Sequence, residues 1–230
     1  MITPFVDYSI PPSSGLKPES IVVLIHGYGS HGRDLLSLGH AWTHYLPHTL
    51  FVAPDGPAPS KRNPFGNEWF GLDDWDPSQK LTEEQIARMV KDIQILAPSF
   101  NRYLDNLLTT HNLPPEKLAI VGFSQGAMVA LHLGLQRPQC AGVIAYSGAF
   151  LDDPEQEKVA HPPVLLVHGL DDDVVPSYSS ELAEGHLHHL HVPVTLCLLP
   201  RLNHGIDKKG LELGRAFLKD HLDKKSQSGL

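Results

Sequence analysis

A serine lies between two glycines at residues 122–126, which read GFSQG. A run of branched apolar residues precedes this motif, and a segment with helical spacing follows it. Where G-x-S-x-G joins a strand to a helix, it exposes the serine hydroxyl at the helix N-terminus, whose free N–H groups favour negative charge. The flanking glycines leave out side chains that would collide with neighbouring backbone. Ser124 is therefore our candidate nucleophile for attack on a carbonyl.

The pentapeptide alone is short and common, and a serine hydroxyl also needs a base to remove its proton. In the known serine, acid, histidine order of this motif the base comes last in the chain. His204, within residues 202–205 (LNHG), follows the last apolar run and precedes a C-terminal helical segment. The chain has 15 His, and the position in this loop is what distinguishes His204 from a capping or surface histidine.

The acid that orients the base should follow the preceding apolar run, where residues 168–176 read HGLDDDVVP. One of Asp171, Asp172 and Asp173 should accept a hydrogen bond from His204, fix its tautomer and stabilise the imidazolium. The other two are expected to be solvated or to act as turn acceptors. Spacing alone does not choose among the three.

An oxyanion formed by attack of Ser124 needs N–H donors that are already in place. One donor should be the backbone N–H of Gln125, and the other should come from the loop after the first strong apolar run, residues 26–30 (HGYGS). Glycines on both sides of Tyr28 would let its N–H face the site. The alternative is a plain glycine turn.

Short apolar runs alternate with longer segments of helical spacing, which predicts a mostly parallel sheet covered by helices on both faces. Ligands bind at the carboxyl ends of the strands in such sheets, where the candidate residues fall. The predicted strands are residues 21–25, 50–53, 118–121, 143–146, 164–167 and 194–199. The predicted helices are residues 33–46, 82–108, 125–135 and 211–222. Residues 82–85 (TEEQ) fit a capping box, and Pro98 should kink or split that helix.

We expect one domain over residues 1–222, since no repeat or linker divides the chain. Residues 54–80 form a long loop rich in Pro, Gly, Trp and Phe. A loop of this length in a compact domain is usually functional, and its part over 57–80 should border the site. Residues 223–230 look like a frayed polar tail.

The composition excludes several classes of function. The net charge of −8 and the absence of a basic stripe disfavour a nucleic-acid-binding protein or one that grips an anionic membrane. The start of the chain lacks a basic segment followed by an apolar one, and no apolar run approaches the roughly 20 residues that span a bilayer. Cys140 and Cys197 are far apart in apolar segments, so we expect buried, reduced thiols. These features predict a soluble, cytoplasmic protein.

Two other patterns could carry chemistry but are weaker. Residues 185–191 (GHLHHLH) place His188 and His191 one helical turn apart, but no carboxylate or cysteine pattern completes a metal site. Ser147 follows a predicted strand without the leading glycine of the Ser124 motif, and we interpret it as a loop serine. We therefore expect neither a metal nor any other cofactor.

Together these motifs resemble the phospholipase/carboxylesterase branch of the α/β-hydrolases, which includes the acyl-protein thioesterases. The resemblance covers roughly residues 20–221. It rests on residues 24–29 (LIHGYG), 53–55 (APD), 69–70 (WF), 122–127 (GFSQGA), 168–176 (HGLDDDVVP) and 203–205 (NHG).

The resemblance implies a single-domain α/β-hydrolase with a mostly parallel sheet, helices on both faces and no large lid. The family's acid, four residues after the first histidine of its segment, falls on Asp172, and its oxyanion donors fall on Tyr28 and Gln125. Its acyl groove borders the loop that carries Trp69 and Phe70, which we expect to be partly exposed as apolar walls. The alternative, which applies most to Trp75, is that Trp69, Phe70 and Trp75 staple this loop to the core.

The family often has a leucine at the position of Tyr28. A backbone N–H is indifferent to that change, but the shape of the acyl pocket can depend on it.

The leading hypothesis is a serine carboxylesterase or acyl-thioesterase acting on small-molecule, short- to medium-chain acyl esters through an acyl-enzyme on Ser124. A second hypothesis is a lysophospholipase or lipase, although the loop at 57–80 is short for a full lid. The third is an inactive hydrolase fold that serves as a binding module, which would be expected to have lost one of the three candidate residues. The long loop could also carry an association surface, which makes a homodimer a hypothesis.

Overall fold

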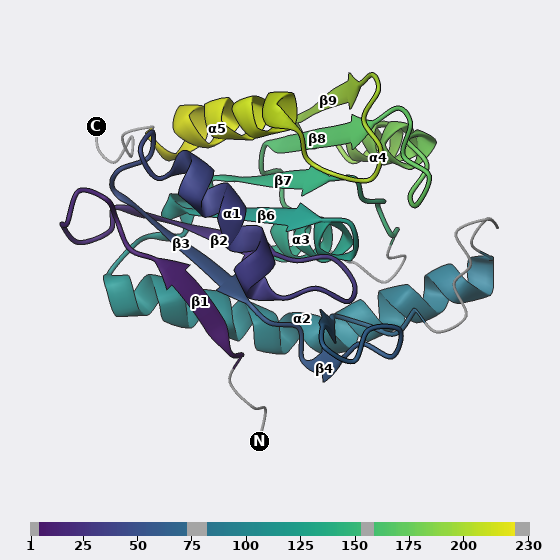
Figure 1. Ribbon diagram of the computed structural model, residues 1–230, viewed down its shortest axis with the longest axis horizontal. Coiled ribbons are helices and arrows are strands. Elements are labelled where there is room, and N and C mark those ends of the chain that lie inside the picture. Colours follow the sequence, from purple (N-terminus) through teal and green to yellow (C-terminus); the bar gives the residue numbers. More distant parts are fainter. Residues whose placement is uncertain (1–4, 73–81, 153–158, 224–230) are drawn as a thin grey trace.

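The computed structural model describes residues 5–72, 82–152 and 159–223 of the chain. Its centre is a seven-stranded sheet in the order β1-β3-β2-β6-β7-β8-β9 (Figure 1). All neighbouring strands are parallel except β1, which pairs antiparallel with β3 at one edge. The strands are β1 (Asp7–Ile10), β2 (Ser20–Ile25), β3 (Thr49–Pro54), β6 (Leu118–Phe123), β7 (Gly142–Tyr146), β8 (Val164–Gly169) and β9 (Val194–Leu199).

Helices cover both faces of the sheet, as the alternation in the sequence predicts. Along β2, Ile21, Val23 and Ile25 face one buried cluster while Val22 and Leu24 face the other, because side chains alternate along a strand. Helices α1 (Gly32–Trp42) and α5 (Lys208–Leu222) pack on one face. Helices α2 (Glu83–His111), α3 (Gln125–Gln136) and α4 (Tyr178–His189) pack on the other. The prediction of a single α/β domain is confirmed.

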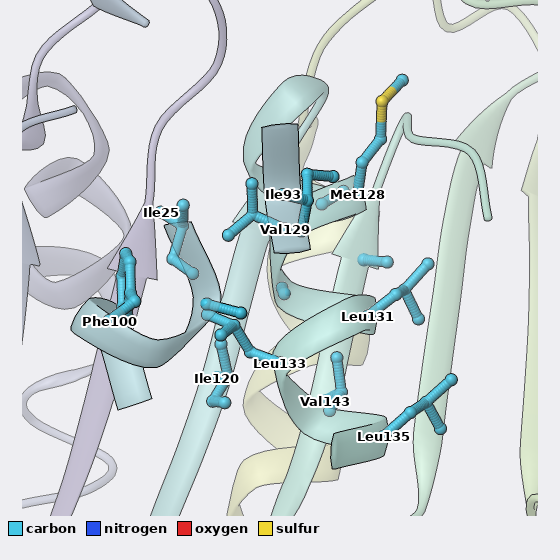
Figure 2. Close-up of a cluster of buried hydrophobic side chains, with 14 of the residues drawn as sticks. Ile25, Ile93, Phe100, Ile120, Met128, Val129, Leu131, Leu133, Leu135 and Val143 are labelled. Atoms are coloured by element: carbon cyan, nitrogen blue, oxygen red, sulfur yellow. The ribbon is translucent and has the colours of Figure 1, made fainter. Parts of the chain in front are cut away.

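Helix α3 lies at the centre of the larger cluster, between the sheet and α2 (Figure 2). Its residues from Gln125 to Leu135 are all buried, including the polar Gln125 and His132, so this stretch presents no face to solvent. Ile93 and Phe100 of α2, both fully buried, pack over it. This packing fixes the N-terminus of α3, which carries the candidate nucleophile.

Several elements differ from the sequence-based expectations. Helix α2 runs without a break through Pro98, so the expected split does not occur, while the capping box between Thr82 and Gln85 is present. Strand β1 was not expected, because its four residues are only half-buried or exposed. Two-residue strands β4 (Ala58–Pro59) and β5 (Asn67–Glu68) pair within the long loop, and a single-turn 3₁₀ helix, η1 (Pro115–Lys117), precedes β6.

Some expectations fall outside the described residues. These are residues 73–80 of the long loop, which include Trp75, and residues 224–230 of the expected polar tail. Helix α5 ends at Leu222, where the domain was expected to end. No helix among the described segments is long and apolar enough to cross a membrane.

Candidate active site

Ser124 forms the turn between β6 and α3. Its φ of 56° and ψ of −119° are a backbone conformation that residues other than glycine rarely adopt. Strain of this kind costs about 1–3 kcal/mol and persists only where the surrounding structure imposes it. The Ser124 amide donates a 2.8 Å hydrogen bond to the carbonyl of Tyr146 on β7, which helps to hold the turn. The Ser124 side chain makes no capping bond to α3, so its hydroxyl is not engaged by the helix.

The two glycines of the motif allow the backbone segments around this turn to approach closely. A Cβ at Gly122 would collide with the carbonyl oxygen of Gly126, and one at Gly126 would collide with the carbonyl of Ile25 on β2. The loop after β2 also comes close, since a Cβ at Gly27 would lie 3.3 Å from the Cβ of Ser124. The motif therefore joins β6, α3 and the end of β2 into one tightly packed unit.

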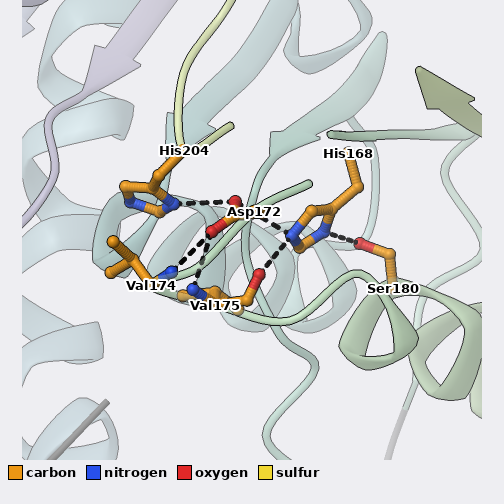
Figure 3. A network of polar contacts seen from close by, with 6 residues as sticks. All are labelled: His168, Asp172, Val174, Val175, Ser180 and His204. Atoms are coloured by element: carbon orange, nitrogen blue, oxygen red, sulfur yellow. Dashed lines mark hydrogen bonds and ion pairs between the residues drawn. The ribbon is translucent and has the colours of Figure 1, made fainter. Parts of the chain in front are cut away.

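His204 and Asp172 meet on the loops that follow β9 and β8. The Nδ1 of His204 lies 2.8 Å from Oδ2 of Asp172 (Figure 3). A carboxylate only accepts, so Nδ1 carries the hydrogen and Nε2 is left as the basic nitrogen. The His204 ring also contacts the ring of Phe123, the residue before Ser124, with centroids 4.8 Å apart. Ser124 and His204 line the same cavity.

The Asp172 side chain has no exposure to solvent. Its Oδ1 accepts hydrogen bonds from the backbone amides of Val174 at 3.0 Å and Val175 at 2.8 Å. Burial alone would raise the pKa of this carboxyl. The hydrogen bonds from His168, His204 and Val175 outweigh burial and hold the pKa well below its usual range. Asp172 therefore carries a negative charge at neutral and mildly acidic pH.

The structure brings only one of the three consecutive aspartates to His204. Asp171 and Asp173 are exposed, as expected for solvated or turn residues, while Asp172 is buried. The geometry therefore favours Asp172, which the resemblance implied and which spacing alone could not select.

The backbone amides of Tyr28 and Gln125 are the candidate oxyanion donors. Both residues line the cavity. Gln125 is the first residue of α3, whose leading N–H groups have no partner within the helix. Among the described residues, no hydrogen bond uses either amide as its donor. This arrangement suits two donors that wait for an anionic oxygen.

The side chain of Gln125 has a role that the sequence reasoning missed. It is buried, its Oε1 accepts from the Trp69 amide at 3.0 Å, and its Nε2 donates to the Phe70 carbonyl at 2.7 Å. The indole of Trp69 in turn donates to the carbonyl of His26 at 2.8 Å. The described part of the long loop is thus fastened to the nucleophile turn.

The expectation that Trp69 and Phe70 are partly exposed beside the site is wrong. Their exposed fractions are only 3% and 4%, and both belong to the core cluster rather than to the cavity wall. Trp69 packs against Phe5, His26 and Phe100. Among the described residues of this loop, Leu72 is the one that lines the cavity. Trp69 and Phe70 can be buried because the hydrogen bonds to Gln125 and His26 satisfy polar groups that a buried loop would otherwise leave without partners.

His26 was also missed as a positioning residue. Its side chain is fully buried, with Nδ1 2.7 Å from the Gly27 carbonyl and Nε2 accepting from the Gly56 amide at 2.9 Å. These partners fix one neutral tautomer, and burial lowers the pKa of the imidazole. The ring therefore holds the loop of Tyr28 against the loop after β3. Its place in the HGYG segment was the available signal.

The cavity that contains these groups has a volume of about 1200 Å³. Its wall is mainly apolar, and it draws on both buried clusters of the fold. From the cluster of α2 and α3 come Leu72, Ile86, Met89, Met128 and Leu151, and from that of α1 and α5 come Leu35, Leu38, Ile206 and Leu211. A cavity of this kind can hold an apolar acyl chain beside Ser124.

The cavity wall does not include the histidine-rich segment at 185–191, the two cysteines or Ser147. Within the described part of the chain, no three His, Cys, Asp or Glu side chains are grouped so that they could hold a metal ion. Cys140 and Cys197 are free thiols, half-buried rather than fully buried as expected. Ser147 follows β7 with a φ of 48° and is fully buried.

Comparison with protein families adds an independent observation. Residues 10–222 match the family model described as Phospholipase/Carboxylesterase. The chain belongs to the phospholipase/carboxylesterase family. Because a family match over nearly the whole chain accompanies the α/β fold, the resemblance stated from the motifs is confirmed and the protein is a hydrolase of this family.

Other family members resemble the chain over most of its length. It is 28% identical over 217 residues to the esterase YpfH of Escherichia coli strain K12. The aligned region covers 94% of this chain and 87% of that protein. It is 27% identical to acyl-protein thioesterase 1 of Schizosaccharomyces pombe over 72% of this chain and 74% of that protein. The crystal structure of esterase PE8 superposes with a TM-score of 0.86 at 39% identity, over 95% of this chain and 99% of that one.

The close approach at the nucleophile turn predicts a large effect of one methyl group. Gly126→Ala should lower the free energy of unfolding by about 3 kcal/mol or more, because its Cβ meets backbone that cannot easily move. Gly185→Ala in α4 is the matched control, since a Cβ there meets nothing within 4 Å and alanine favours a helix. Urea unfolding followed by circular dichroism measures both. Equal stability of the two variants would contradict the tight packing.

Proposed function

We propose that this hydrolase is a serine carboxylesterase that cleaves short- to medium-chain acyl esters, and thioesters of similar size, through an acyl-enzyme on Ser124. The observation that carries the proposal is the 2.8 Å contact between Nδ1 of His204 and buried Asp172 on the cavity that Ser124 lines. The names of the relatives, esterase and acyl-protein thioesterase, support both leaving-group types.

In the proposed reaction, Nε2 of His204 takes the proton of the Ser124 hydroxyl as Oγ attacks the acyl carbonyl. The tetrahedral oxyanion accepts hydrogen bonds from the amides of Tyr28 and Gln125. His204 then gives the proton to the leaving alcohol or thiol, and the acyl group stays on Oγ. Water, deprotonated by His204, releases the acid in a second round of the same steps. Asp172 keeps Nδ1 protonated and stabilises the imidazolium that forms twice.

Replacement of the nucleophile tests the proposal directly. Ser124→Ala should lower kcat for p-nitrophenyl butyrate by about 10³-fold or more and abolish labelling by a fluorophosphonate, because no other group can form the acyl-enzyme. Ser147→Ala is the matched control, since Ser147 also follows a strand at positive φ but is fully buried. It should keep both activities.

Labelling that persists in Ser124→Ala would remove Ser124 from its role. A folded wild-type protein that neither labels nor hydrolyses any ester would favour the binding-module hypothesis instead.

The pKa of Asp172 predicts the shape of the pH profile. Because Asp172 stays ionised well below pH 7, it should add no protonation step to the acid limb of kcat/KM, along which activity falls as the pH falls. The limb should therefore be no steeper than a slope of one in a logarithmic plot between about pH 7 and pH 4.5. Asp173→Asn, on the exposed neighbour, should leave it unchanged. A slope of two would mean that a second group titrates in this range.

The cavity wall favours an esterase over a lysophospholipase, the second candidate. Asp34 carries a negative charge there, and no Lys or Arg belongs to the described residues of the wall. A phosphate in the leaving group would therefore find no cation among them.

Matched substrates separate the two activities. With the same octanoyl chain, kcat/KM for the monoacylglycerol should exceed that for lysophosphatidylcholine by about tenfold or more, because only the second leaving group carries a phosphate. Both substrates are measured below their critical micelle concentrations by acid release in a pH-stat. A preference for the phospholipid would reverse the assignment.

The cytoplasmic location and the homodimer stay predictions from the sequence.

A further inference from the structure

A second histidine lies on the opposite side of Asp172 from His204 (Figure 3). His168, near the end of β8, is fully buried, and its Nε2 lies 3.2 Å from the same Oδ2 that His204 contacts. The same Nε2 is 2.7 Å from the carbonyl oxygen of Val175. The Val175 amide, in turn, donates to Oδ1 of Asp172 at 2.8 Å. His168 thus contacts Oδ2 of Asp172 directly. It also binds the carbonyl of Val175, the residue whose amide donates to Oδ1.

The partners of the ring fix where its hydrogen lies. Nε2 of His168 faces a carboxylate and a carbonyl, which only accept, so Nε2 carries a hydrogen. Nδ1 is 2.6 Å from the hydroxyl oxygen of Ser180 on α4, and Ser180 is only 2% exposed. The Ser180 hydroxyl pairs with Nδ1 and so holds the ring from its other side.

We propose that His168, held by Ser180, is a positioning residue that fixes the Asp172 carboxylate for His204. The inference rests on the proposed function, because it concerns how the base of that reaction is oriented. Without His168, Oδ2 would keep His204 as its one side-chain partner among the described residues, and the Val175 carbonyl would lose its hydrogen bond. The carboxylate and the Val174–Val175 segment would then be free to turn away from His204.

The depressed pKa of Asp172 agrees with this role. The hydrogen bond from His168 is the largest of the effects that lower it against burial, and His168 and His204 are the titratable groups that act on it. The competing interpretation is a purely structural one, in which His168 merely ties β8 to α4 through Ser180. That interpretation predicts an effect on stability without a specific effect on His204.

Two amide substitutions separate the contacts of the ring. Glutamine can place its Nε2 near the position of the imidazole Nε2 and so keep the donor toward Asp172 and Val175. Asparagine reaches only as far as Nδ1 and so keeps the Ser180 contact alone. His168→Asn and His168→Gln therefore form a matched pair of similar polarity, and Ser180→Ala removes a single oxygen from the far side of the ring.

His168→Asn should lower kcat for p-nitrophenyl butyrate by about 10- to 100-fold with KM within about threefold, as loss of an orienting partner does elsewhere. Its acid limb of kcat/KM should move to lower pH, because the imidazolium of His204 loses stabilisation when Asp172 moves away. His168→Gln should restore kcat to within about threefold of wild type. Ser180→Ala should shift kcat and the acid limb in the same direction as His168→Asn, but less.

The proposal is overturned if His168→Asn and His168→Gln lower the melting temperature alike and leave equal kcat values, or if the acid limb of His168→Asn does not move. Should His168→Asn fail to fold, an unchanged kcat and acid limb in Ser180→Ala overturns it equally. Fluorophosphonate labelling and hydrolysis by the wild type are measured first. Their absence would reject the proposed function itself, whereas their presence with equal variants rejects only the role of His168.

Discussion

The buried charge of Asp172 constrains the whole carboxyl edge of the sheet. An ionised carboxylate without solvent is tolerated only where donors replace its lost hydration, which is otherwise worth several kcal/mol or more. The donors to Asp172 come from three places: His168 on β8, the Val174 and Val175 amides of the next loop, and His204 on the loop after β9. The loops after β8 and β9 must therefore meet where they do, because a displacement of either would leave the charge without enough partners.

The Ser124 turn depends on a different constraint, which is steric rather than electrostatic. Gly122 and Gly126 let β6, α3 and the end of β2 approach within distances that a Cβ would forbid. The same approach brings the loop of Tyr28 beside Ser124, so one packing requirement places both the nucleophile and a candidate oxyanion donor. Burial of the apolar side chains of α3 stabilises the fold, and this offsets the backbone strain of Ser124 at its positive φ.

The sequence was informative where one residue type meets one local requirement. The glycines around Ser124 and the apolar runs of the parallel strands are such cases, and they predicted the turn and the sheet. Asp172 could not be separated from its neighbours by spacing, because the choice depends on amides that the loop folds back toward the carboxylate. The interpretation of Trp69 and Phe70 was wrong for a related reason: aromatic residues in a loop fit a pocket wall or a core equally well, and the buried Gln125 amide decides for the core. Strand β1 carries almost no hydrophobic signal, since backbone pairing at a sheet edge defines it.

The location of the cavity follows from the same architecture. The two buried clusters are separated by the sheet along most of its area, but the sheet ends at the carboxyl edge, and there both clusters contribute side chains to one cavity. Ser124, at the end of a central strand, stands at this junction. Apolar wall therefore extends from the nucleophile toward α2 and α3 on one side and toward α1 and α5 on the other. An ester has one substituent on each side of its reacting carbonyl, and this cavity offers apolar wall from both buried clusters. The polar groups of Ser30, Asp34 and Ser37 lie in the part of the wall next to α1, whereas apolar side chains such as Leu72, Met89 and Met128 form the wall next to α2 and α3, so the two sides of the cavity differ in polarity.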